Sequence, residues 1–283
     1  MKHKRIVTLF IIGTVIATLA SVYQLIDMTD TATGFFKIQF QKAGWLVSAF
    51  IGIVVACIGL ISCQSRRLPK APNTSSPVFA AISVAYAVGS IYEVFANGFV
   101  LSLSSPLQLI VKVFCFLAAG AVVVLGLRGI IKCTSFGLLA LLPLCYSLLR
   151  LILPFARYSH LPAIAQNVYE LAFLCLQLVF WLYAAMLLNN INIHKAIAFL
   201  LPVSLMTACV CSVIAVPHLV AYFVKPEVIH EGAVHPVFLP FFALYSVFYV
   251  LDIFSLKRMY KRVAHSQKAA GISNAEFYTG DKK

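Results

Sequence analysis

The sequence Arg150-Leu-Ile-Leu-Pro-Phe-Ala-Arg157-Tyr158 closes one apolar run, and after a short polar turn a second apolar run opens on Tyr169-Glu170. Each run has about the 20 residues that a helix needs to cross the hydrocarbon core of a bilayer. The stretch from Thr134 to Asn190 therefore predicts two membrane-crossing helices with a tight connection. Charges of both signs lie just inside one membrane face, which marks this end of the hairpin as the place to look for function.

Composition supports a membrane protein along the whole chain. Of the 283 residues, 61% are hydrophobic and 11% are charged, whereas soluble domains average about 25% charged residues. The formal net charge of +13 does not indicate a nucleic-acid binder, because the basic residues form short clusters between apolar runs. The eight cysteines show no paired spacing in a polar loop, and we interpret them as small apolar residues.

The order of apolar runs predicts an all-α, polytopic transmembrane helix bundle. One transmembrane domain, residues 1–256, is followed by a basic, disordered tail over residues 257–283. A cleaved signal peptide in place of the first span would leave seven spans. The eight expected spans cover residues 6–26, 45–63, 78–100, 107–127, 135–154, 167–188, 196–216 and 236–254.

The distribution of basic residues predicts the orientation. Sixteen of the 22 lysine and arginine residues fall on the side that holds both termini, and two lie within spans. The opposite side has only Lys37, Lys42, Arg157 and Lys225. Cytoplasmic loops are enriched in Lys and Arg, so we expect a multi-pass protein of the cell membrane with both termini in the cytoplasm.

Short motifs carry a resemblance to a family. They are Asp30-x-x-x-Gly34-Phe35 after the first span, and Leu141-Leu-Pro143 through Leu149-Arg150 to Phe155-x-Arg157-Tyr158 in the hairpin. In these features the chain resembles functionally uncharacterised bacterial multi-spanning membrane proteins, over about the first six spans. The resemblance implies the architecture and a bacterial inner membrane, and it implies no activity.

Polar residues inside the spans point to a candidate site. Ser83, Tyr86, Ser90, Glu93 and Asn97 recur at spacings of three and four, which places them on one stripe of a helix. Burying a charge near the bilayer centre costs about 2.5 to 3.5 kcal/mol on insertion scales, so this stripe must face protein or water.

Neighbouring spans offer partners for this stripe. Lys112, Arg150 and Glu170 lie, like Glu93, within about 10 Å of the outer ends of their spans. Two acids and two bases at one level favour ion pairing. The candidate solute-binding or ion-pair cluster consists of Glu93, Lys112, Arg150, Glu170, Tyr86, Tyr146 and Gln177.

Two interpretations of this cluster remain open. In the first, the basic side chains reach the outer interface and the acids pair with them as a link between helices. In the second, the cluster lines an outward-facing cavity that binds or transports a small polar or zwitterionic solute. The first interpretation corresponds to a non-catalytic accessory or sensor protein that works through protein partners, and the second to a solute-binding or transport protein.

Catalytic and metal-binding signals are weak. The expected outer loop over residues 217–235 holds His218, His230 and His235, which are weak candidates for a zinc-like site, but their spacing lacks the His-Glu-x-x-His pattern. The sequence has no nucleophile elbow and no phosphate-binding glycine loop. We therefore expect no cofactor and favour a non-enzymatic protein. Near the cytoplasmic end of the last span, Asp252 is expected to pair locally with Lys257 or Arg258.

Overall fold

The structure, a computed structural model, describes residues 2–30, 35–63, 76–127, 138–158, 165–189, 191–226 and 234–251. Within these ranges the chain is 91% helical and forms no strand, which confirms the predicted all-α class. The expected tail at 257–283, Asp252 and its basic partners, and His230 lie outside the described residues.

The helices follow one another through short connections. The last helix of the described chain covers Phe238–Leu251, and we refer to it as the last helix. The other elements are α1 (Lys2–Tyr23), the π-helical turn η1 (Gln24–Met28), η2 (Ile38–Phe40), α2 (Gln41–Cys63), α3 (Ser76–Ala96), α4 (Gly98–Leu101), α5 (Ser105–Leu127), η3 (Leu138–Ala140), α6 (Leu141–Tyr158), α7 (Ala165–Leu188) and α8 (Ile193–Val224).

Six of these helical segments are long and apolar enough to cross a membrane, judged by length and composition. They overlap the expected first, second, third, fourth, sixth and seventh spans. The fifth and eighth expected spans correspond to shorter apolar helices, Leu141–Ala156 and Phe238–Leu251. The six long segments indicate a membrane protein.

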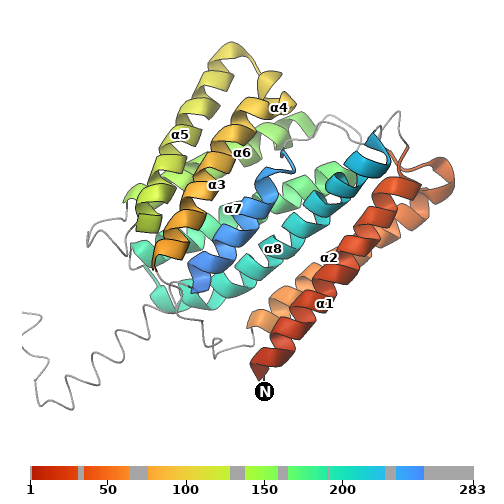
Figure 1. Ribbon diagram of the computed structural model, residues 1–283, viewed down its shortest axis with the longest axis horizontal. Coiled ribbons are helices and arrows are strands. Elements are labelled where there is room, and N and C mark those ends of the chain that lie inside the picture. Colours follow the sequence, from red (N-terminus) through yellow and green to blue (C-terminus); the bar gives the residue numbers. More distant parts are fainter. Residues whose placement is uncertain are drawn as a thin grey trace, which may run out of the picture.

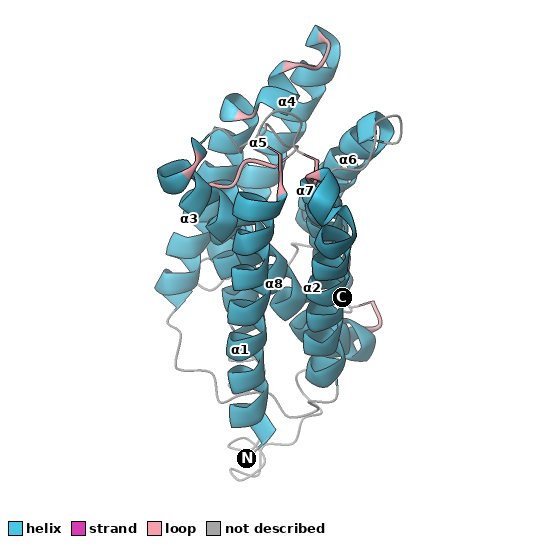
Figure 2. Ribbon diagram, turned by 90° about the vertical axis from the view of Figure 1, so that its right-hand side faces the viewer, coloured by secondary structure: helices cyan, strands magenta, loops and turns pink. Residues whose placement is uncertain are grey.

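The helices run side by side, as Figure 1 shows, with α1 and α2 at one flank and α3 and α5 at the other. Packing proceeds from α3 to α5, α6, α7 and α8, and α8 then packs against both α1 and α2. Figure 2 shows the bundle from a perpendicular direction, with α1 in front. Large apolar side chains such as Leu46 (71% exposed) and Leu60 (66%) cover the outside, a surface suited to lipid.

The last helix fills the space between α3 and α7 through aromatic side chains. The Tyr245 ring stacks on Tyr86 of α3 at a centroid distance of 4.9 Å and lies 5.5 Å from Trp181 of α7. The Phe238 ring lies 5.5 Å from Tyr86 and 6.3 Å from Phe173 of α7. All five side chains are buried, so the interior of this half of the bundle is largely aromatic.

Helix α8 differs from the expected span 196–216, because it continues through Pro217 to Val224. Proline has no N–H, so the carbonyl of Val213 one turn earlier lacks its usual donor. The hydroxyl of Ser21 in α1 donates to this carbonyl at 2.8 Å. The neighbouring helix thus replaces the missing hydrogen bond, which is the usual way in which a proline is accommodated inside an apolar bundle.

The expected third span, 78–100, is divided in two. Helix α3 ends at Ala96, and after Asn97 the short helix α4 begins at Gly98. The break falls at Asn97-Gly98, two residue types that favour turns over helix interiors. It lies one turn beyond Glu93 and shapes one wall of the site described below.

A glycine sets the close packing of α3 against α5. Gly126 of α5 is buried, and a Cβ atom placed there would meet the Cβ and Oγ atoms of Ser83. Gly120, on the same helix, is exposed and has open space around it. We expect Gly126→Ala to lower the free energy of unfolding by about 1 to 3 kcal/mol, because the two helices must separate.

The matched control for this prediction is Gly120→Ala. It should leave stability unchanged or raise it by up to about 1 kcal/mol, since alanine is the better helix former. Thermal unfolding of both variants in detergent micelles tests the pair. Equal midpoints for the two would contradict the α3–α5 contact.

Candidate functional site

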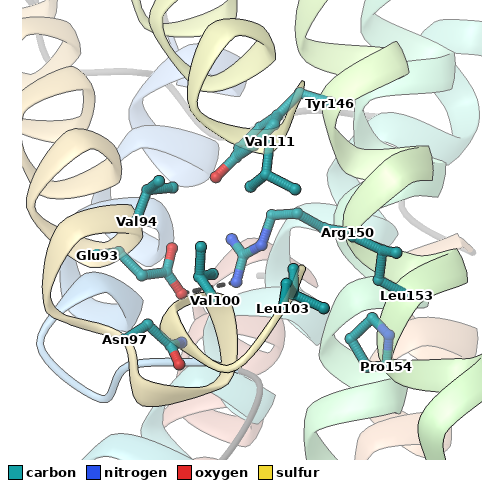
Figure 3. A pocket seen from close by; sticks show the side chains of 10 residues that line it. All are labelled: Glu93, Val94, Asn97, Val100, Leu103, Val111, Tyr146, Arg150, Leu153 and Pro154. Atoms are coloured by element: carbon teal, nitrogen blue, oxygen red, sulfur yellow. Dashed lines mark hydrogen bonds and ion pairs between the residues drawn. The ribbon is translucent and has the colours of Figure 1, made fainter. Parts of the chain in front are cut away.

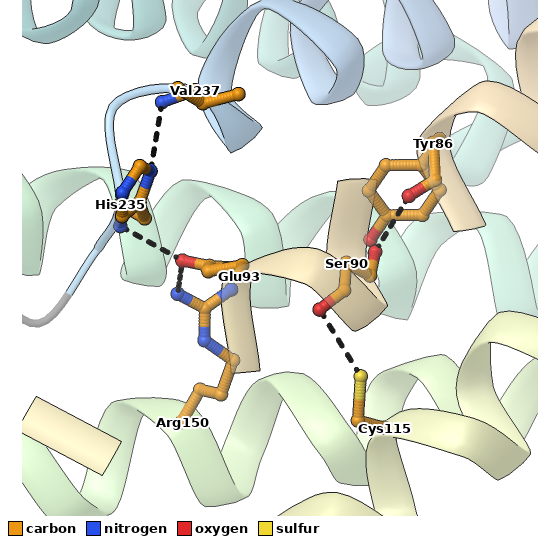
Figure 4. A network of polar contacts seen from close by, with 7 residues as sticks. All are labelled: Tyr86, Ser90, Glu93, Cys115, Arg150, His235 and Val237. Carbon is orange, nitrogen blue, oxygen red and sulfur yellow. Dashed lines mark hydrogen bonds and ion pairs between the residues drawn. The ribbon is translucent and has the colours of Figure 1, made fainter. Parts of the chain in front are cut away.

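The centre of the candidate site is an ion pair between Glu93 of α3 and Arg150 of α6. Arg150 Nη2 donates to Glu93 Oε1 at 2.6 Å, and the two residues are only 8% and 1% exposed. The backbone N–H of His235 donates to the same carboxylate oxygen at 3.1 Å, as Figure 4 shows. Three segments that are distant in the sequence therefore meet on one oxygen atom.

The pairing uses only one oxygen and one nitrogen of two groups that can form two parallel hydrogen bonds. Glu93 Oε2 and Arg150 Nη1 are both buried and have no hydrogen-bond partner among the residues that the structure describes. The acceptor Oε2 and the donor Nη1 can therefore each form a further hydrogen bond. Leaving buried charged groups partly unsatisfied costs free energy, so this arrangement calls for an explanation.

Aromatic rings surround the guanidinium of Arg150. Its carbon lies 5.2 Å from the ring centroid of Phe238 and 5.8 Å from that of Tyr146, within the range of cation–π attraction. The Tyr146 hydroxyl is buried near the Cys115 thiol and has no hydrogen-bond partner within the described chain. The thiol itself donates to the carbonyl of Ser90 at 3.4 Å.

A small cavity lies against these groups. Its polar lining comes from Glu93, Asn97, Tyr146 and Arg150, and apolar side chains from α3 to α6 complete it (Figure 3). The Glu93 carboxylate, the Arg150 guanidinium and the Tyr146 hydroxyl point toward one another across this space. The volume is about 20 Å³, which is room for about one water molecule.

The structure separates the expected cluster into a centre and a periphery. Glu93, Arg150 and Tyr146 meet at the cavity, whereas Tyr86 belongs to the aromatic interior. Lys112 lies apart, with its Nζ 5.3 Å above the ring of Phe95, an exposed residue on the outside of α3. The side chain of Lys112 is long enough to extend to the surface. The sequence pattern could not distinguish this outward direction from an inward one.

The two expected members on α7 do not line this cavity either. Glu170 is buried near the beginning of α7. Gln177 is buried two turns further along, and both polar atoms of its side chain lack hydrogen-bond partners in the described part of the chain. One turn beyond Gln177, the Nε1 atom of Trp181 is also without a partner there.

The histidine candidates are placed differently from one another. His218 was expected in a loop, and this prediction is wrong. It is buried inside α8, because the helix continues through Pro217. His235 precedes the last helix, and its Nδ1 accepts the backbone N–H of Val237 at 3.3 Å. Partial burial lowers the pKa of His235 below its ordinary value, which favours this neutral ring. Among the residues described, no three His, Cys, Asp or Glu side chains gather as a metal site.

Sequence reasoning missed two parts of the site, the His235 backbone donor and the Phe238 ring. The available signal was Pro236, because the residue before a proline favours an extended conformation and the N–H groups at the start of a helix lack helical partners. It also missed a polar network just beyond the C-terminal end of α1, in which Tyr169 donates to Gln24 at 2.8 Å and Gln24 donates to Ser48 at 2.8 Å.

No family model, curated protein or solved structure matches this chain.

Proposed function

We propose that the protein binds a small zwitterionic solute at Glu93 and Arg150 from the outer side of a cell membrane, as a receptor or transporter. The observation that carries the proposal is that the ion pair uses a single hydrogen bond. It leaves Glu93 Oε2, Arg150 Nη1 and the Tyr146 hydroxyl without partners in the described chain, and all three residues line one cavity. A carboxylate suits the free guanidinium nitrogen, and an ammonium group suits the free carboxylate oxygen.

In this proposal the ion pair is the closed state of the site. With space for about one water molecule, the cavity admits a solute only when α3 and α6 move apart. The solute's carboxylate then replaces Glu93 on Arg150, and its ammonium group replaces Arg150 on Glu93. Each buried charge keeps a partner in both states, which lowers the cost of the exchange.

The proposed setting is an eight-span protein of a bacterial inner membrane with cytoplasmic termini. Support for the fifth span comes from η3 and α6, which together cover residues 138–158. Support for the eighth comes from the last helix, whose apolar sequence continues to Phe254 with Asp252 as its one charged residue. The excess of basic residues on one side supports the orientation, which puts Glu93, Arg150 and His235 toward the outer surface.

The alternative function is that of an accessory membrane protein in which the pair only links helices. The near-complete burial of both side chains and the small cavity favour this alternative. Under it, the pair holds α3, α6 and the segment before the last helix together. The two functions differ in whether a solute that carries both charges competes for the pair.

Thermal unfolding of the purified protein with a panel of small solutes tests this difference. Glycine, alanine and taurine carry both charges, whereas acetate and methylammonium carry one each. We expect at least one zwitterion to raise the unfolding midpoint by about 2 °C or more and the single-charge controls to have no effect. The variant Glu93→Gln/Arg150→Met should lose the response.

The accessory function makes the opposite prediction. No member of the panel would then change the midpoint, or a zwitterion would act equally on the protein and on the double variant. Either result would remove the solute-binding proposal.

A further inference from the structure

We propose that a second cavity, bordered by α1, η1, α7 and α8, binds a small monovalent cation that donates hydrogen bonds, namely ammonium. The cavity has a volume of about 20 Å³. Its polar lining consists of Ser21, Gln24, Thr29, Tyr169 and His218. The inference does not rest on the proposed zwitterion site, with which this cavity shares no lining residue.

The hydroxyl hydrogens of the cavity are committed to the protein. Ser21 donates to the carbonyl of Val213, which Pro217 leaves without a helical donor, at 2.8 Å. Thr29 donates to the carbonyl of Gln24 at 3.0 Å, across the π-helical turn η1. A carbonyl oxygen only accepts, so the direction of both bonds is fixed. Each hydroxyl oxygen keeps lone pairs for a further donor.

The Gln24 amide is committed in the same way. Its Nε2 donates to the carbonyl of Gly44 and to Ser48 Oγ, both at 2.8 Å. The carbonyl of Gly44 fixes which end of the amide is nitrogen, so Oε1 must be the atom that faces the Tyr169 hydroxyl. Tyr169 donates to it at 2.8 Å. These residues therefore have no free hydrogen to offer an occupant.

His218 supplies the strongest remaining acceptor. It is 7% exposed, and its Nδ1 lies 2.7 Å from the carbonyl of Ile214. Since that carbonyl can only accept, Nδ1 carries the hydrogen, and in the neutral ring Nε2 presents a lone pair. Nε2 has no hydrogen bond to any residue of the described chain. Because His218 lines the cavity, this nitrogen is available to a donor that binds there.

The lining thus presents lone pairs alone, from Ser21, Thr29, Tyr169 and His218. An anion would meet no donor, and a cation or another donor would meet several acceptors. The polar lining includes no carboxylate, so it suits one positive charge better than two. The volume matches an ion about the size of water.

The presence of an imidazole acceptor selects ammonium over alkali ions. Hard metal cations prefer shells of oxygen ligands, whereas a nitrogen lone pair readily accepts an N–H hydrogen bond. Two irregular helical segments, η1 and the Pro217 turn of α8, border the cavity. Irregular helical segments often border the ion sites of membrane transporters.

Titration of the full-length protein in detergent micelles tests the proposal. The buffer contains choline chloride at constant pH and ionic strength, and ammonium, potassium or sodium chloride replaces the choline stepwise. Thermal unfolding and isothermal calorimetry give the response. We expect a saturable stabilisation by ammonium and none by sodium or by potassium, which matches ammonium in size but donates no hydrogen bond.

Thr29→Val keeps the side-chain shape and removes one acceptor, and it should weaken the ammonium Kd about tenfold or more. His218→Leu should remove binding altogether. The matched control is Thr207→Val, because Thr207 is also buried but donates within α8 to the carbonyl of Val203 and does not line the cavity. An equal response to potassium, no response to ammonium, or an unchanged Kd in the folded Thr29→Val variant would overturn the proposal.

Discussion

Replacing Arg150 with methionine is expected to lower the free energy of unfolding by about 3 to 5 kcal/mol. Methionine keeps much of the side-chain volume but leaves the Glu93 carboxylate, which is 1% exposed, without its cation. The backbone N–H of His235 would be its only remaining donor in the described chain. Chemical or thermal unfolding in detergent micelles measures the loss.

The double variant Glu93→Gln/Arg150→Met provides the control. With neither charge present, no buried ion is left alone, and most of the lost stability should return. The double variant should then fold but show no response to zwitterions. If the single variant Arg150→Met were as stable as the double variant, Glu93 and Arg150 would not form the buried pair on which the site depends.

Phe238→Ala is expected to cost about 3 to 5 kcal/mol as well. The Phe238 ring is fully buried, lies beside the Arg150 guanidinium and packs against Tyr86 and Phe173. Its removal leaves a void where α3, α7 and the last helix meet, and it removes one of the two rings next to the guanidinium.

Phe223→Ala is the matched control for this prediction. Phe223 lies at the end of α8 and is 77% exposed, so its loss should change the free energy of unfolding by less than about 0.5 kcal/mol. Unfolding midpoints of the two variants, measured in the same detergent, give the comparison. Similar losses for Phe238→Ala and Phe223→Ala would contradict the packing of the last helix in the interior.

The sequence was sufficient to predict the all-α class, and it singled out Glu93 and Arg150, which the structure pairs. Long apolar runs form helices, because every backbone N–H and C=O group in an apolar solvent needs a hydrogen-bond partner within the chain. The spacing of Ser83 to Asn97 placed Glu93 on a stripe that faces the interior, and Glu93 is indeed buried. Arg150 was expected at the same level and pairs with it.

The remaining features depend on contacts between distant segments. Pro217 was expected to end a helix, but Ser21, far away in the sequence, satisfies the carbonyl that this proline leaves free. Lys112 has the same helical spacing as inward residues, yet it extends over Phe95 at the surface. A periodic pattern gives the face of a helix, whereas the neighbour on that face follows from packing that no local pattern encodes.

The most direct test of an outward-facing site at Glu93 and Arg150 is the water accessibility of Asn97, which lines the cavity. The Asn97→Cys variant is made in a background without the eight native cysteines. A membrane-impermeant thiol reagent is then added from the outside. Ile38→Cys, at a position 95% exposed in the connection after α1, is the positive control, and Val113→Cys, on the apolar outside of α5, is the negative control. We expect Asn97→Cys to be labelled, and we expect a bound zwitterion to slow this labelling. Complete protection of Asn97→Cys, in protein that folds and labels at Ile38→Cys, would contradict it.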